Sequence, residues 1–271
     1  MAALAATAPS LGAAANFAVL SAAPLHGGAV TCTDGTITGN VGSSGLRASV
    51  VQTSCPITGS IVAPVSAKVV ADFNTAYAAF AAIPCGTTFA APTLGSTTLA
   101  SGVYCFPAGL TLTGTLTLTG SGPWIFKIGT GGTGALTGTN FNVVMAGGGN
   151  PCDVTWWVAQ AATMTDSNFI GTILAGAAIT LTRGTFHGDA LAKAAVTITG
   201  TAVTGCPATK GHGEGDEVHC NQGVGNGPEG CDPGNSNNHN TSNDELGGTP
   251  GDPGRQGDND KHTSKTERNR E

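Results

Sequence analysis

A repeat with a period of 17 residues occupies positions 162–205 and constrains the fold more than any other feature of the chain. In register, its segments read ATMTDSNFIGTILAGAA, ITLTRGTFHGDALAKAA and the partial VTITGTAVTG. Matched apolar columns at a fixed period indicate stacked coils, because one coil of this size is too small to bury its own core. The repeat therefore predicts a mainly β chain folded as a solenoid.

Each segment contains an alternating triplet near its start, T-M-T, T-L-T or T-I-T. Side chains alternate across a strand, so the apolar residue is expected to point inward and both threonines outward. Threonine is common on exposed β faces, but here it fills both outward positions of all three strands. Stacked about 4.7–4.9 Å apart, the strands form two ladders made of Thr163, Thr165, Thr180, Thr182, Thr197 and Thr199.

The charge distribution divides the chain into a neutral body and an acidic tail. Residues 1–205 hold five acids and five bases, whereas the last 66 residues hold 12 acids and six bases, which accounts for the net charge of −6. The tail has too few apolar residues to offset its ordering entropy. We therefore expect a leader or signal-peptide remnant at 1–10, a solenoid domain at 11–206 and a disordered tail at 207–271.

The body offers no signal for a nucleic acid or a membrane. It has no cluster of Lys and Arg, and no run of about 18 apolar residues that could span a bilayer. Neither partner is expected, and the chain is expected to be a monomer.

Eight cysteines indicate an oxidising compartment, and hence a secreted protein. No C-x-x-C occurs, so disulfides are favoured over a zinc site. Sequence cannot fix the connectivity, but proximity suggests the pairs Cys32–Cys55, Cys85–Cys105, Cys152–Cys206 and Cys220–Cys231.

Residues 64–83 are the one segment with a convincing helical pattern. Apolar residues recur there at a spacing of three and four, after Pro64 and before Pro84. This helix is expected to pack along the side of the coils. The adjacent Trp156 and Trp157 must point to opposite sides of a strand, which predicts one in the core and one under the helix or a loop.

The residues give little support for catalysis. A lyase on such a fold would need clustered carboxylates, but the five acids of the body are scattered. No nucleophile elbow is present, and GTGGTG at 129–134 lacks the lysine and the βαβ context of a phosphate loop. We predict no catalytic residue, no metal site and no cofactor.

The chain resembles the secreted microbial ice-binding (antifreeze) protein family, in ordered blocks over about 190 residues. The blocks are LGAAANFAVLSAA (11–23), ITGNVG (37–42), DFNTAYAAF (72–80), SGVYCF (101–106), LTLTGTLTLTG (110–120), WIFKIG (124–129), NVVMAGGGNPCDVTWWVA (142–159) and FIGTILAGAAITLTRGTFHGDALAKAAVTITG (169–200). The departures are the extra cysteines, the acidic tail and the lack of a large capping insertion before the helix.

The resemblance implies a discontinuous right-handed β-solenoid of triangular cross-section, with one long α-helix beside it and one flat face that binds ice. Members often carry loose T-G/A-x-T/N motifs on that face. Residues 137–140 fit this motif directly, whereas 165–168 and 182–185 fit only its ends and 199–202 only its start. The motif adds Thr137, Thr139, Asn140, Asn168, Thr185 and Thr201 to the six ladder threonines as candidate ice-binding residues.

Two functions from different classes therefore stay open. One is adsorption to ice, with inhibition of ice growth and recrystallisation. The other is a secreted structural or adhesive module that uses the same solenoid to bind glycans or cell surfaces without affinity for ice.

Overall fold

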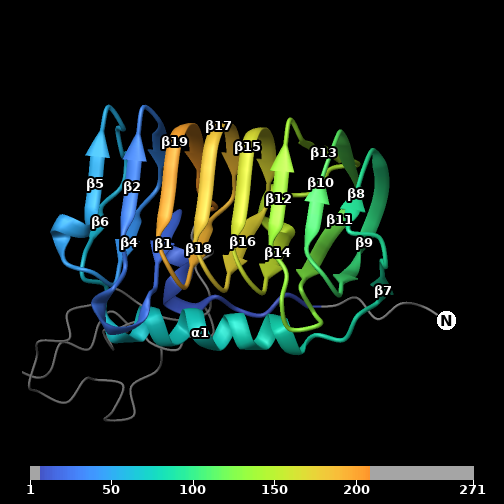
Figure 1. The fold of residues 1–271 in the computed structure, drawn as a ribbon, viewed down its shortest axis with the longest axis horizontal. Coiled ribbons are helices and arrows are strands. Elements are labelled where there is room, and N and C mark those ends of the chain that lie inside the picture. Colours follow the sequence, from blue (N-terminus) through green and yellow to red (C-terminus); the bar gives the residue numbers. More distant parts are fainter. Residues whose placement is uncertain (1–6, 208–271) are drawn as a thin grey trace, which may run out of the picture. The chain divides into compact units, whose positions relative to one another are not determined.

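The computed structural model describes residues 7–207, which form a β-solenoid with one α-helix along its side (Figure 1). The strands pair in parallel with those of the next coil. Short 3-10 turns join some strands, at Gly12–Asn16 (η1), Pro24–His26 (η2), Arg47–Ser49 (η3) and Pro151–Asp153 (η4). The predicted mainly β solenoid and its helix are confirmed.

One row of strands carries the alternating threonine triplets, and we call its outer surface the threonine face. Its strands are β2 (Val30–Thr33), β5 (Val50–Thr53), β8 (Thr93–Leu94), β10 (Leu110–Leu112), β12 (Leu136–Thr139) and the first parts of β15 (Ala162–Ile170), β17 (Ile179–His187) and β19 (Val196–Thr204).

A second row follows around each coil, and we call its outer surface the second face. It comprises β3 (Thr36–Thr38), β13 (Asn142–Ala146), the first parts of β9 (Thr97–Phe106) and β11 (Thr115–Ile128), and the second parts of β15, β17 and β19.

The third row lies under the helix, and we call it the helix face. It comprises the second parts of β9 and β11 together with β1 (Val19–Ser21), β4 (Val41–Ser43), β6 (Ile61–Val62), β7 (Thr87–Thr88), β14 (Val154–Val158), β16 (Thr172–Ala175) and β18 (Ala190–Ala192).

The order of coils in the stack differs from their order in the chain. Along the threonine face the strands follow the order β8, β10, β12, β15, β17, β19, β2, β5. The last strand therefore pairs with the first coil, and two N-terminal coils extend the stack beyond it. The helix α1 then runs along the side of the stack, and the segment after it leads the chain to β7 at the other end (Figure 1).

The helix spans Ala67–Ala82, slightly less than the predicted 64–83. Ser66 is extended, with φ −66° and ψ 155°, so Pro64 lies before the helix and not in its first turn. The apolar stripe is as expected: Val69, Phe73, Ala76 and Phe80 are buried against the helix face.

Lys127, on β11, secures the end of this helix. Its side chain is buried, and Nζ donates hydrogen bonds to the carbonyl oxygens of Ala81, at 2.8 Å, and Ile83. Burial lowers the pKa of Lys127. The last carbonyls of a helix have no partner within it, so this ammonium replaces the missing donors.

We expect Lys127→Met to lower the free energy of unfolding by about 1–3 kcal/mol, since it leaves two partly buried carbonyls at the end of the helix without their charged donor. Thermal and urea denaturation would measure the change. Lys68→Met is the matched control on the exposed side of the helix, where Lys68 pairs with Asp72 and its side chain is 73% exposed. Equal losses in the two variants would contradict the role of Lys127.

Aromatic side chains stack along the inside of the coils. Phe126 lies over Trp156 with centroids 3.9 Å apart, and Phe169 stacks on Phe186 at 5.5 Å. Trp156 is fully buried there, whereas Trp157 packs under the helix and donates from Nε1 to the carbonyl of Tyr77 at 3.0 Å. The prediction for the two tryptophans is confirmed.

Three of the four suggested disulfides are present, namely Cys32–Cys55, Cys85–Cys105 and Cys152–Cys206. Cys32–Cys55 links the coil that contains β2 to the end coil that contains β5. Cys85–Cys105 links β9 to the segment before β7 near the other end of the stack. The third holds the segment after β19. The suggested Cys220–Cys231 pair lies outside the described residues, as do most of the predicted leader and tail. Within 7–207, α1 is too short and too polar to cross a bilayer.

Candidate functional site

The threonine ladders run along nearly the whole stack and not over three strands alone. A first ladder contains seven consecutive threonines and ends at Val51, and a second contains six. In stack order, the first is Thr93, Thr111, Thr137, Thr163, Thr180, Thr197 and Thr31, and the second is Thr139, Thr165, Thr182, Thr199, Thr33 and Thr53.

The ladders are regular because the core fixes every strand in the same register. Met164, Leu181 and Ile198 point inward and are buried, as the triplets predict. Neighbouring threonines along a ladder are separated by the strand spacing of about 4.8 Å, and the two ladders by two residues of a strand, about 6.6 Å. The result is a two-dimensional array with a fixed repeat.

The hydroxyls of this array are free to bind solvent. Within residues 7–207, no ladder threonine uses its Oγ1 in a hydrogen bond to the protein, whereas Thr172 and Thr185 on other faces do. β-Branched side chains have few χ1 options. The threonine side chains are therefore held in fixed orientations, while their hydroxyl groups have no hydrogen-bond partner within residues 7–207.

Small side chains border the first ladder on the side away from the second. The residue two positions before the ladder threonine is Ala29, Ala135, Ala161, Ala178 or Ala195 in five of the strands, and each is partly exposed. Such short side chains leave the threonines accessible from that side.

Asn168 and Thr185 do not lie on the threonine face. They occupy the second face, where Thr185 Oγ1 donates to Asn168 Oδ1 and Asn168 Nδ2 donates to Asn142 Oδ1, both at 2.8 Å. These polar groups satisfy one another. The fourth position of the loose motif thus belongs to a different surface from the first, except at Asn140, which lies on the corner between them.

Thr201 was wrongly predicted to be a surface residue. It is 2% exposed, and its Oγ1 donates to the carbonyl of Thr199 at 3.4 Å. Gly200 before it has φ +63°, which turns the chain and directs the next side chain inward. Ser167 occupies the position equivalent to Thr201 two repeats earlier and is buried in the same way. Gly184 occupies this position in the repeat between them.

The corner between the threonine face and the second face is a column of residues in the left-handed region. Each follows a threonine of the second ladder, and their φ values lie between +48° and +63°. We call them the corner column: Asn140, Asp166, Arg183, Gly200, Asp34 and Ser54. Gly, Asn and Asp adopt this conformation readily, whereas Arg183 is the one long side chain among them.

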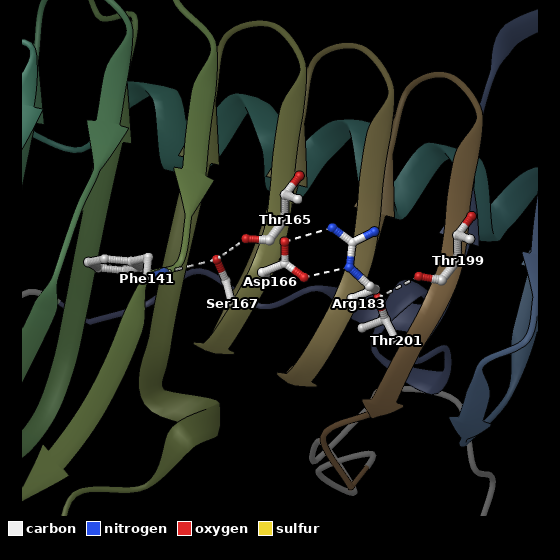
Figure 2. Close-up of polar contacts among 7 residues, drawn as sticks. All are labelled: Phe141, Thr165, Asp166, Ser167, Arg183, Thr199 and Thr201. Carbon is white, nitrogen blue, oxygen red and sulfur yellow. Dashed lines mark hydrogen bonds and ion pairs between the residues drawn. The ribbon is translucent and has the colours of Figure 1, made fainter.

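Arg183 and Asp166 form an ion pair on this corner (Figure 2). Nε lies 2.5 Å from Oδ1 and Nη2 lies 2.7 Å from Oδ2, so the contact is bidentate. The hydrogen bond from Arg183 lowers the pKa of Asp166, and the same bond raises the pKa of Arg183. Both groups are therefore charged at neutral pH, beside an otherwise uncharged array.

Asp189 is the one carboxylate of residues 7–207 that is fully buried, and it lies at the start of β18 on the helix face. It is 2% exposed; Oδ1 accepts from the N–H of Cys206 at 2.9 Å and Oδ2 from Oγ1 of Thr172 at 3.4 Å. Burial raises its pKa to about 7, although both hydrogen bonds act in the opposite direction. In the same residues, no three His, Cys, Asp or Glu side chains gather in a possible metal site.

Comparison with known proteins agrees with this geometry. The profile of the family described as ice-binding-like matches residues 25–204. An ice-binding protein of Flavobacterium frigoris (strain PS1) is 30% identical over 190 residues, which cover 63% of this chain and 66% of that protein. The chain thus spans just under two thirds of the length of that relative.

Solved structures of similar fold carry the same description. One is an ice-binding protein from the Antarctic ascomycete Antarctomyces psychrotrophicus, with 29% identity and a TM-score of 0.64, over 73% of this chain and 98% of that one. Another, from an Antarctic bacterium of the Flavobacteriaceae, has 34% identity and a TM-score of 0.65, over 73% of this chain and 47% of that one. The family profile covers well over half of the sequence, and the chain therefore belongs to the ice-binding-like family.

Proposed function

We propose that this protein adsorbs to ice through the threonine face and thereby inhibits ice growth and recrystallisation. Family membership and the matched structures support ice binding as the function. The observation that carries the choice of face is the pair of threonine ladders, whose hydroxyls make no hydrogen bond to any other group within residues 7–207.

The chemistry of threonine suits this role. Each side chain presents a methyl group, which favours leaving bulk water, and a hydroxyl, which can hold an ordered water in place. The side chains are fixed before contact, so little conformational entropy is lost on adsorption. Each contact is weak, and adsorption depends on many of them acting together on one rigid plane.

The proposal describes a secreted, monomeric, non-enzymatic protein whose partner is the ice surface. The disulfides support an oxidising compartment. The acid groups of the described residues support no catalytic arrangement, since the buried Asp189 faces a backbone N–H and a threonine. Nucleic acid and membranes are not part of the proposed function.

Ice-affinity partitioning tests the proposal directly. We expect the purified, oxidised chain to enter a slowly growing ice ball and to inhibit recrystallisation in the same sample. Exclusion of a folded sample from ice would refute the proposal and favour the adhesive module, which a glycan array would then examine.

A further inference from the structure

The corner column separates two surfaces that both carry threonine. On one side lie Thr165 and Thr182 of the second ladder, and on the other lie Asn168 and Thr185 of the second face. Asn140, Gly200 and Ser54 are uncharged, and Asp34 places a single carboxylate near one end of the column. Near the middle of the stack, Asp166 and Arg183 place two paired charges on the ridge between the surfaces (Figure 2).

Stability does not account for this pair. Both side chains are exposed to solvent, Arg183 by 59% and Asp166 by 36%, and exposed ion pairs contribute little to folding. Their strands are already held in register by backbone pairing and by the Phe169–Phe186 stack beneath them. Arg183 in addition adopts a φ of +57°, which a long side chain rarely does. Residues kept in such conformations occur preferentially at functional sites.

Charge has a specific effect at the edge of an ice-contact surface. A carboxylate and a guanidinium hold their own water, and removing that water is costly. Methyl groups carry no such penalty, and the penalty for an uncharged hydroxyl is much smaller and is offset when it hydrogen-bonds to ordered water. Ice that contacts the ladders is therefore not expected to continue across the ridge at these two coils.

We propose that the Asp166–Arg183 pair sets the edge of the ice-contact surface and restricts adsorption to the threonine face, so that the second face stays in liquid water. The proposal rests on ice binding as the proposed function. It makes the pair a determinant of which ice planes are bound, and not of whether the protein binds ice.

The test compares the ice planes bound by dye-labelled full-length protein on a single-crystal ice hemisphere. The wild type is expected to label one set of planes. The Asp166→Asn, Arg183→Gly double variant, whose new residues suit the left-handed corner, is expected to label the same set and gain a second. The exchanged pair, Asp166→Arg with Arg183→Asp, retains both charges and is expected to show the wild-type pattern.

Three results would overturn the proposal. They are an unchanged pattern in the neutral variant, two sets of planes already labelled by the wild type, and loss of adsorption by a neutral variant that melts like the wild type. A wild type that adsorbs to no plane would refute the proposed function itself, and this inference with it.

Discussion

Replacing Thr182 with tyrosine is expected to reduce thermal hysteresis at least about tenfold, because a loss of only about 1.4 kcal/mol in adsorption free energy already lowers the affinity for ice tenfold. Thr182 lies in the middle of the second ladder, with Thr165 and Thr199 on either side. A ring at this point rises above the plane, so neighbouring threonines cannot meet a flat lattice. Thermal hysteresis and partitioning into ice measure the loss.

His187→Tyr provides the matched control for that variant. His187 lies on the same strand, β17, but is exposed on the second face. We expect this variant to keep wild-type activity, and both variants to melt near the wild type because both sites are at the surface. Normal activity in Thr182→Tyr together with a loss in His187→Tyr would assign ice binding to the second face.

The second large effect is expected on stability, from Asp189→Asn. The pKa of Asp189 is about 7 in the folded chain, against 3.8 as the ordinary value. The folded chain therefore binds a proton that the unfolded chain releases between pH 4 and 7, and wild-type stability should fall as pH rises through this window. The free energy of unfolding falls by at most about 4 kcal/mol over this window. Above it, Asp189 is charged in both states and contributes no further change.

Asparagine is neutral at every pH and can still accept the hydrogen bond from the N–H of Cys206. We therefore expect Asp189→Asn to match the wild type near pH 4 and to be more stable at pH 8. Melting curves from pH 4 to 8 measure this difference, with Asp34→Asn, at an exposed corner, as the control. A variant less stable than the wild type at pH 8 would show that the carboxylate is needed charged.

The repeat contains enough information to predict the solenoid and the direction of its side chains. Met164, Leu181 and Ile198 are inward and the threonines beside them outward because alternation along a strand depends only on local geometry. The assignment of Thr201 from the loose motif was wrong, because alternation along the strand ends where Gly200 turns the chain. When an alternating pattern is extended past a corner residue, it predicts an outward side chain where the structure has an inward one.

The full length of the ladders could not be predicted from the period. T-C-T at 31–33 and T-L-T at 111–113 are visible in the sequence, but loops of different length separate them from the repeat. Their place in the array depends on which coils stack, and β2 follows β19 only in space. Lys127 was missed for a related reason, since its partners at the end of the helix are 44 and 46 residues away.

The position of β19 between β17 and β2 also governs when the molecule can be completed. Ser21 donates a hydrogen bond to the carbonyl of Ala194, 173 residues later. During synthesis, the first two coils have only each other to stack on until the last strand emerges, and contacts of such sequence separation form slowly. Until then, the edge strands of the N-terminal coils are unpaired. Unpaired strand edges make a partly folded chain prone to aggregate. We therefore expect the pairing of β19 with β2 to form late in folding, and it joins the two N-terminal strands of the threonine array to the other six in one surface.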